Sequence, residues 1–194
     1  MGQRKTTPAN RERIIATAAQ LIREHGIDNT TLSDIAVAAG ISKGTLYYYY
    51  STKGDLIFDV AERHMQNMTD RIFRWLESSG TDLPPRKVFR MVLDTVMHSQ
   101  SRGLIHIYLI QEALTENPSL RKRFVEEYRR WRGLIEEGLD RIYRDNRDHG
   151  AAARVLLSTI DGLIMQRLVG VERLPVDAIA EFFEDALSPT APRR

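Results

Sequence analysis

Residues 31–56 read TLSDIAVAAGISKGTLYYYYSTKGDL, and this stretch decides how the first part of the chain folds. Thr31 to Asp34 has the form of a capping box, in which a side-chain hydroxyl satisfies a free backbone amide at a helix start. Gly40 is the kind of residue that ends a helix, and a new short helix is expected to begin at Ser42 or Lys43. Two short helices around so tight a turn predict a helix-turn-helix unit.

The apolar and polar residues of this unit fall on different faces. Ile35, Ala36, Ile41 and Leu46 are spaced to bury one small core, and the small alanines allow the two helices to cross closely. The opposite face of the second helix presents hydroxyls, a cation and flat aromatic rings, all of which can reach phosphates or base edges. This face consists of Ser42, Lys43, Gly44, Thr45, Tyr47, Tyr48 and Tyr49. Because a helix of this size fits the major groove, the pattern predicts DNA binding.

Residues 40–56, GISKGTLYYYYSTKGDL, resemble the helix-turn-helix of the TetR family of one-component bacterial repressors. The family pattern is of the type G-[VI]-S-x-G-x-[LI]-Y-x-[HY]-F-x-[ST]-K-x-x-L. Tyr49 and Tyr50 stand where histidine and phenylalanine are frequent, and we expect Tyr50 to pack inward against Leu46. A tyrosine run can also be half-buried core, but so short a helix cannot bury four consecutive rings, which favours DNA contact for Tyr47 and Tyr48.

The resemblance implies an Ω-shaped homodimer whose two recognition helices enter successive major grooves of a palindromic operator. By the same resemblance, Lys53 would meet a phosphate at the start of the next helix, and Thr31 would combine DNA contact with its capping role. Arg4 and Lys5 are expected to form a loose arm in the minor groove or along the backbone. The full set of expected DNA contacts is Thr31, Ser42, Lys43, Gly44, Thr45, Tyr47, Tyr48, Tyr49 and Lys53.

The rest of the chain follows the helical period, without the alternation of strands and without hairpin turns such as Asn-Gly. We predict an all-α protein of about nine helices, given typical helix lengths. Residues 1–54 would form a three-helix DNA-binding domain, and residues 55–194 an effector-binding and dimerisation domain. The helices are expected at residues 10–25, 31–39, 43–49, 53–78, 86–99, 104–116, 118–145, 150–169 and 176–187, with a break at Gly103.

Composition excludes several classes of protein. The 194 residues include 28 basic and 26 acidic ones, so the formal charge of +2 is too small for a histone-like coat. Residues 1–54 nevertheless carry seven basic and four acidic side chains, whereas residues 55–194 carry 21 and 22. The absence of cysteine excludes disulfide frameworks, zinc knuckles and thiol nucleophiles. The N-terminus does not resemble a signal peptide, and the apolar segment 151–171 contains three charged residues, which predicts a cytoplasmic protein with no membrane partner.

The resemblance also implies an effector pocket among the helices after residue 54. Methionine and aromatic side chains adapt to apolar ligands of irregular shape. The inward candidates are Met68, Phe89, Met91, Met97, His98, Tyr108, Gln111, Trp131 and Met165. For any one of them the competing interpretation is plain core, which is the commoner role of such residues. The five histidines show no metal-binding spacing with carboxylates, and we predict neither a metal nor a cofactor.

Residues 150–169 and 176–187 are the candidates for a dimer interface. The first helix has an apolar surface too wide for one neighbour, and the second adds further apolar side chains. The expected interface residues are Leu156, Thr159, Ile160, Leu163, Ile164, Ile179, Phe182 and Phe183. A symmetric four-helix interface is expected because reading a palindrome needs two copies. The alternative is that these side chains form the core of a monomer.

These features predict a DNA-binding transcriptional regulator, and in particular a repressor that a small apolar or amphipathic effector releases from its operator. One alternative is an all-α enzyme that uses His98, His106 and Glu112 around an internal cavity. The sequence contains no recognisable nucleophile–base pair, phosphate loop or metal motif, so we predict that the chain is not an enzyme. The other alternative is a constitutive DNA-binding protein without an effector.

Overall fold

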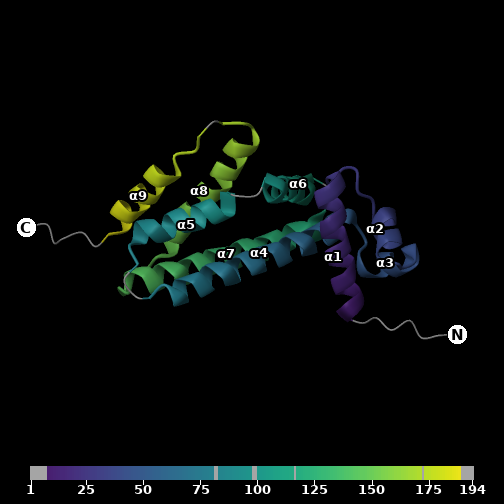
Figure 1. Cartoon of the computed structure of the whole chain (residues 1–194), viewed down its shortest axis with the longest axis horizontal. Coiled ribbons are helices and arrows are strands. Elements are labelled where there is room, and N and C mark those ends of the chain that lie inside the picture. Colours follow the sequence, from purple (N-terminus) through teal and green to yellow (C-terminus); the bar gives the residue numbers. More distant parts are fainter. Residues whose placement is uncertain (1–7, 81–82, 98–99, 116, 172, 189–194) are drawn as a thin grey trace, which may run out of the picture. The chain divides into compact units, whose positions relative to one another are not determined.

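A computed structural model of the chain describes residues 8–80, 83–97, 100–115, 117–171 and 173–188 (Figure 1). These ranges contain nine α-helices and no strand, which confirms the all-α prediction. The expectations for Arg4, Lys5 and His98 fall outside the described residues. The helices are α1 (Pro8–His25), α2 (Leu32–Ala38), α3 (Lys43–Tyr49), α4 (Lys53–Ser78), α5 (Pro85–Met97), α6 (Gln100–Thr115), α7 (Pro118–Tyr143), α8 (Gly150–Leu168) and α9 (Val176–Leu187).

The chain divides into two compact units. One contains Met1–Gln66 with Ile105–Arg121, and the other contains Asn67–Leu104 with Lys122–Arg194. This division differs from the functional boundary predicted after residue 54, because the first turns of α4 pack with α1–α3. The boundary between a DNA-binding and an effector domain therefore stays a prediction.

The first unit is organised around a hydrophobic core formed by α1, α2, α3 and the start of α4, which we call the N-terminal core. Ile35, Ala36 and Leu46 are buried in it, which confirms the prediction that they face inward. Ile41 is half-buried against this core. Because Leu56 and Val60 contribute to this core, the start of α4 packs with α1, α2 and α3. The buried members of the N-terminal core are Ile14, Ile15, Ala18, Ile35, Ala36, Leu46, Tyr50, Leu56 and Val60.

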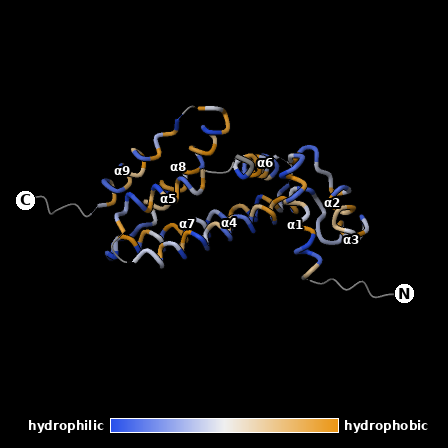
Figure 2. Tube along the Cα trace, viewed as in Figure 1, coloured by the Kyte–Doolittle hydropathy of each residue, from blue (hydrophilic) through white to orange (hydrophobic). Residues whose placement is uncertain are grey.

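The second unit has its own core, which we call the C-terminal core. It joins α5, α8 and α9 to Leu139 of α7, and the rings of Phe89 and Phe183 lie 5.7 Å apart in it. Hydrophilic and hydrophobic residues alternate along α4 and α7 (Figure 2), as in helices that bury one face. No helix in the described ranges is long and apolar enough to span a bilayer.

Gly103 lies inside α6, so the prediction of a helix break at this residue is wrong. A side chain here would meet α8, because an added Cβ would lie 3.1 Å from Cγ2 of Ile164 and 3.3 Å from Cδ1 of Leu168. The glycine therefore permits a close approach of two helices. A sequence rule that treats glycine as a helix breaker does not include this packing reason.

Candidate nucleic-acid interface

The start of α2 is fixed by the capping box that the sequence predicts. The Thr31 Oγ1 atom accepts from the Asp34 amide at 3.2 Å, and the Asp34 carboxylate accepts from the Thr31 amide at 3.0 Å. The Thr31 hydroxyl also donates to this carboxylate at 2.6 Å. These hydrogen bonds from the side chain and backbone of Thr31 hold the pKa of Asp34 below its ordinary value. Thr31 thus positions α2 and remains exposed beside it.

The turn between α2 and α3 uses one glycine in the left-handed region. Gly40 has φ of +64°, a conformation that costs other residues energy, and the following Ile41 amide donates to the Ala36 carbonyl at 3.0 Å. Ser42 then caps α3, because its Oγ atom accepts from the Thr45 amide at 3.1 Å and lies 2.8 Å from the Thr45 hydroxyl. The turn chemistry therefore sets where α3 begins.

The two faces of α3 differ sharply in exposure. Leu46 is completely buried in the N-terminal core, whereas Tyr47 is 55% exposed and Tyr48 is 72% exposed. Lys43 and Gly44 are exposed as well, and Thr45 is half-buried. Large aromatic side chains left in water on a short helix mark a surface for a partner.

Tyr49 does not share this exposed face, and the prediction that it does is wrong. It follows Leu46 by three residues, which brings its side chain back toward the core side of the helix. The ring is half-buried against the N-terminal core, and its hydroxyl is buried without a hydrogen-bond partner among the described residues. Tyr50 is only 4% exposed, as predicted.

Lys53 begins α4 and is half-buried. Its ammonium donates a hydrogen bond to the Ile27 carbonyl, in the connection between α1 and α2. An ammonium has three donor hydrogens, so this bond is compatible with a second acceptor such as a phosphate. The contact between Lys53 and DNA stays a prediction.

Val37 is a surface residue of α2 that the sequence reasoning did not select. Its side chain is 78% exposed, while Ile35 and Ala36 are buried. A signal was available, because Val37 lies off the face defined by Leu32, Ile35, Ala36 and Ala39. Val37 is therefore an exposed apolar side chain on the helix that precedes α3.

The candidate effector residues are divided between the two compact units. Tyr108 and Gln111 belong to the first unit, and the others that the structure describes belong to the second. Met68, Phe89 and Met97 are buried, and Met91, Tyr108 and Trp131 are half-buried. Two inward assignments are wrong, since Gln111 is exposed and Met165 is 55% exposed. Each stands two positions after a buried leucine, Leu109 or Leu163, which turns it toward the opposite face of its helix.

The predicted dimer residues also divide into two groups. Ile164 and Ile179 are half-buried in their own chain, and so is Thr159, whose hydroxyl donates to the Val155 carbonyl. Phe182 is 63% exposed. The remaining four residues are buried in the C-terminal core of a single chain, so the prediction that they form a free surface is wrong: Leu156, Ile160, Leu163 and Phe183.

Other exposed apolar side chains lie on α8 and just after it. Val155 and Met165 are each 55% exposed on α8, and Val169 is 81% exposed just after it. Together with Phe182 they form the set that we call the α8–α9 surface residues. Because α8 is apolar on most sides, the sequence alone did not show which side faces its own core.

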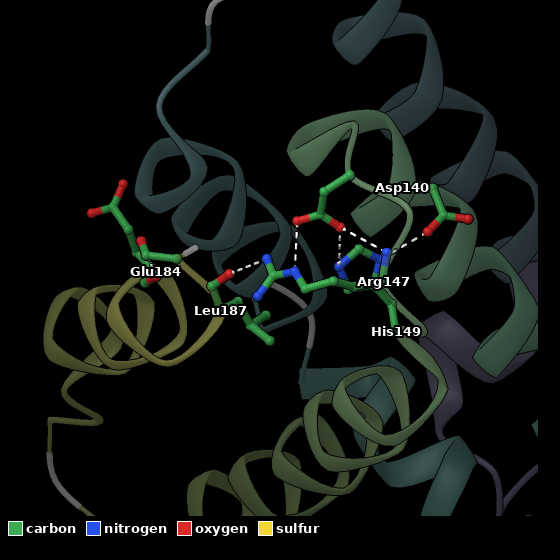
Figure 3. Close-up of polar contacts among 7 residues, drawn as sticks. Asp140, Arg147, His149, Glu184 and Leu187 are labelled. Carbon is green, nitrogen blue, oxygen red and sulfur yellow. Dashed lines mark hydrogen bonds and ion pairs between the residues drawn. The ribbon is translucent and has the colours of Figure 1, made fainter. Parts of the chain in front are cut away.

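The connection between α7 and α8 contains a buried histidine, together with an arginine that reaches the end of α9 (Figure 3). The His149 side chain is 3% exposed, with Nδ1 2.8 Å from Asp140 and Nε2 3.5 Å from Asp145. Arg147 pairs with Asp145 at 2.6 Å and donates to the Leu187 carbonyl. Burial acts to raise the pKa of Asp145, but the hydrogen bonds from Arg147 outweigh it and hold that pKa below its ordinary value. This arrangement stabilises the chain between two core helices.

The two short helices, their glycine turn and the exposed face of α3 define a helix-turn-helix DNA-binding protein. Residues 14–60 match the family of bacterial regulatory proteins described as the tetR family. Residues 86–191, more than half of the chain, match the C-terminal domain of the BetI-type transcriptional repressors. The chain therefore belongs to the TetR family of transcriptional regulators.

Among curated relatives, the transcriptional regulator YvdT of Bacillus subtilis is 38% identical over 68 residues, which are 35% of this chain and 35% of YvdT. The match thus spans only about a third of the length of that relative. The transcriptional repressor KstR2 of Rhodococcus jostii is 28% identical over 159 residues, which cover 77% of this chain and 75% of KstR2.

Two solved structures have the same fold. The Thermus thermophilus TetR-family repressor FadR, in complex with lauroyl-CoA, is 23% identical with a TM-score of 0.68, and the match covers 95% of this chain and 98% of FadR. A Saccharomonospora viridis protein in complex with choline is 24% identical with a TM-score of 0.67, covering 92% of this chain and 95% of that one. At these identities the likeness shows the fold alone.

Proposed function

We propose that this regulator is a repressor that binds a palindromic operator as a homodimer through α3 and leaves it when a small apolar or amphipathic effector binds. The observation that carries the proposal is the face of α3, which exposes Lys43, Tyr47 and Tyr48 next to a helix start capped by Ser42. Hydroxyls, an ammonium and flat rings at that position are the groups that read DNA.

Within this proposal the exposed residues of α3 have different roles. Lys43 neutralises a phosphate without regard to sequence, whereas Tyr47 and Tyr48 lie against base edges and sugars. Lys53 adds a phosphate contact from the start of α4. The excess of three basic residues in positions 1–54 doubles in a dimer and supplies a salt-dependent attraction to DNA.

The homodimer is proposed to form through the α8–α9 surface residues. Phe182, Val155, Met165 and Val169 leave large apolar areas in water in a single chain. A second copy that covers them would remove this exposed area, and twofold symmetry would match the symmetry of the operator. In such a dimer the two recognition helices would read half-sites separated by about one turn of DNA.

The effector is proposed to contact the second compact unit, where Met68, Met91, Met97 and Trp131 offer adaptable apolar side chains. The lauroyl chain and the choline in the two structural neighbours belong to those proteins, and they support amphipathic molecules as the first ones to try. Thermal shift across a metabolite panel, followed by DNA binding with each hit, tests this part. If no hit weakens DNA binding, the constitutive alternative replaces it.

The DNA-binding proposal is tested by selecting duplexes from a random library with the full chain and then measuring gel shifts. Lys43→Ala should weaken binding to all duplexes alike and reduce the salt slope by about 2 for a dimer with two such contacts. Tyr48→Ala should change which duplexes are preferred. Lys87→Ala, which removes an exposed lysine from α5, is the matched control and should change neither property. Unchanged binding by both α3 variants would refute the proposal.

A further inference from the structure

A buried carboxylate connects three helices beside the recognition helix. Asp59, on α4, is 4% exposed. Its Oδ2 atom accepts a hydrogen bond from the Tyr50 hydroxyl at 2.6 Å and from the Arg11 guanidinium at 2.7 Å. Arg11 belongs to α1, and Tyr50 is the residue that ends α3. All three residues lie in the same compact unit.

These contacts compensate a group that is costly to bury. An ionised carboxylate in a low-dielectric core is unfavourable unless a charge and hydrogen-bond donors satisfy it. Arg11 supplies a charge from a partly exposed position, and Tyr50 supplies a neutral donor from inside. Burial, with the hydrogen bond to Asp59 in second place, raises the pKa of Tyr50 above its ordinary value. The hydroxyl therefore remains a donor throughout the neutral range.

The hydroxyl of Tyr50 is not needed to fill the core. Phenylalanine is frequent at this position in the helix-turn-helix pattern, and its ring would occupy nearly the same space next to Leu46. What tyrosine adds is one directed bond to Asp59 at the point where α3 ends. The Tyr50 amide already closes the last turn of α3 on the Leu46 carbonyl at 3.0 Å. The backbone of Tyr50 thus completes the last turn of α3, and the side chain of Tyr50 binds α4.

We infer that Asp59 is a positioning residue that fixes the orientation of α3 for operator recognition, through Tyr50 at the end of α3 and Arg11 on α1. The inference rests on the proposed DNA-reading role of α3. Contacts to base edges depend on the exact placement of a few side chains, whereas attraction to phosphates tolerates small rotations of the helix. Loosening this link should therefore cost specific binding more than non-specific binding.

Tyr50→Phe is the decisive variant, because it keeps the ring and deletes only the hydroxyl. Affinity is measured for a duplex that the wild-type chain selects from a random library and for a scrambled duplex of the same length and composition. We expect affinity for the selected duplex to fall about tenfold, and affinity for the scrambled duplex to stay within about twofold. Tyr143→Phe is the matched control, since it removes a buried hydroxyl in the other unit that has no hydrogen-bond partner among the described residues. It should change neither affinity.

A double-mutant cycle tests whether the hydroxyl acts through Asp59. Asp59→Leu removes the carboxylate without leaving a buried charge, and Tyr50→Phe should then cause no further loss of specific binding. If Asp59→Leu does not fold, Tyr50→Phe alone decides. Equal losses on both duplexes together with a lower melting temperature would indicate a merely structural role and overturn the inference, as would unchanged affinity for the selected duplex. If the wild-type chain enriches no duplex, the proposed function fails and the positioning role falls with it.

Discussion

Phe182→Ala is the variant that tests the α8–α9 surface residues as a dimer interface. A phenylalanine side chain presents roughly 150–250 Å² when fully exposed, and Phe182 keeps 63% of its surface exposed in a single chain. A second copy that covers the ring would remove roughly 100–150 Å² per subunit from water, which contributes about 3 kcal/mol at about 25 cal/mol per Å². A dimer contains two such rings and alanine retains part of the area of each, so we expect the dimer dissociation constant to rise at least about a hundredfold.

Sedimentation velocity across the micromolar range measures this change, because the wild-type chain should sediment as a dimer and the variant should shift toward monomer. Phe183→Ala is the matched control, one residue along the same helix. Phe183 is 4% exposed in the C-terminal core, so its removal should lower the free energy of unfolding by about 3–5 kcal/mol instead of selectively weakening association. A wild-type monomer at these concentrations, or a Phe182→Ala dimer as tight as the wild type, would refute the assignment of this surface.

Three further predictions concern the elements that hold the helices in place. Thr31→Ala breaks the capping box and should lower the melting temperature by about 2–4 °C at neutral pH. The folded state holds the pKa of Asp34 low, so the ionised carboxylate stabilises the fold above its ordinary pKa of 3.8, and this stabilisation is lost as the pH falls. The difference in melting temperature between Thr31→Ala and the wild type should therefore narrow in acid. Gly40→Ala should lower the free energy of unfolding in urea by roughly 1–2 kcal/mol, because φ of residue 40 is positive. Gly44 does not have a positive φ, so an equal loss of stability in Gly44→Ala would contradict this reason. His149→Ala should lower the free energy of unfolding by about 2 kcal/mol or more, and an unchanged urea midpoint would show that the buried ring is not needed.

The helix-turn-helix was predictable because its boundaries are encoded locally. Thr31, Gly40 and Ser42 each act on backbone groups within four residues, so the sequence contains the whole cause of where α2 and α3 begin and end. The apolar spacing also predicts that Leu46 faces inward, although its burial is completed by residues of α1 and α4. The same local encoding holds for α7, where the Asn117 side chain caps the first turn through the Leu120 amide at 2.9 Å.

The orientation of apolar helices was not predictable in the same way. Residues on every side of α8 are apolar, so periodicity cannot separate Leu163, which packs in the core, from Met165, which faces water. Likewise Gly103 has the composition of a helix end, and only its close approach to Ile164 explains why the helix continues through it. Both outcomes depend on neighbours that are distant in the sequence, which no local rule includes.

Tyr48 and Tyr50 show how the two kinds of information combine in one short segment. Both belong to the same tyrosine run, yet one ring is 72% exposed and the other 4% exposed, as their spacing from Leu46 indicates. Spacing does not reveal the partner of the buried hydroxyl, because Asp59 lies nine residues further on and Arg11 lies 48 residues before Asp59. Local caps can therefore specify that α3 exists, whereas its orientation depends on contacts between distant residues. If α3 reads base edges as proposed, a substitution in those distant contacts should alter recognition even though it leaves the helix and its exposed face unchanged.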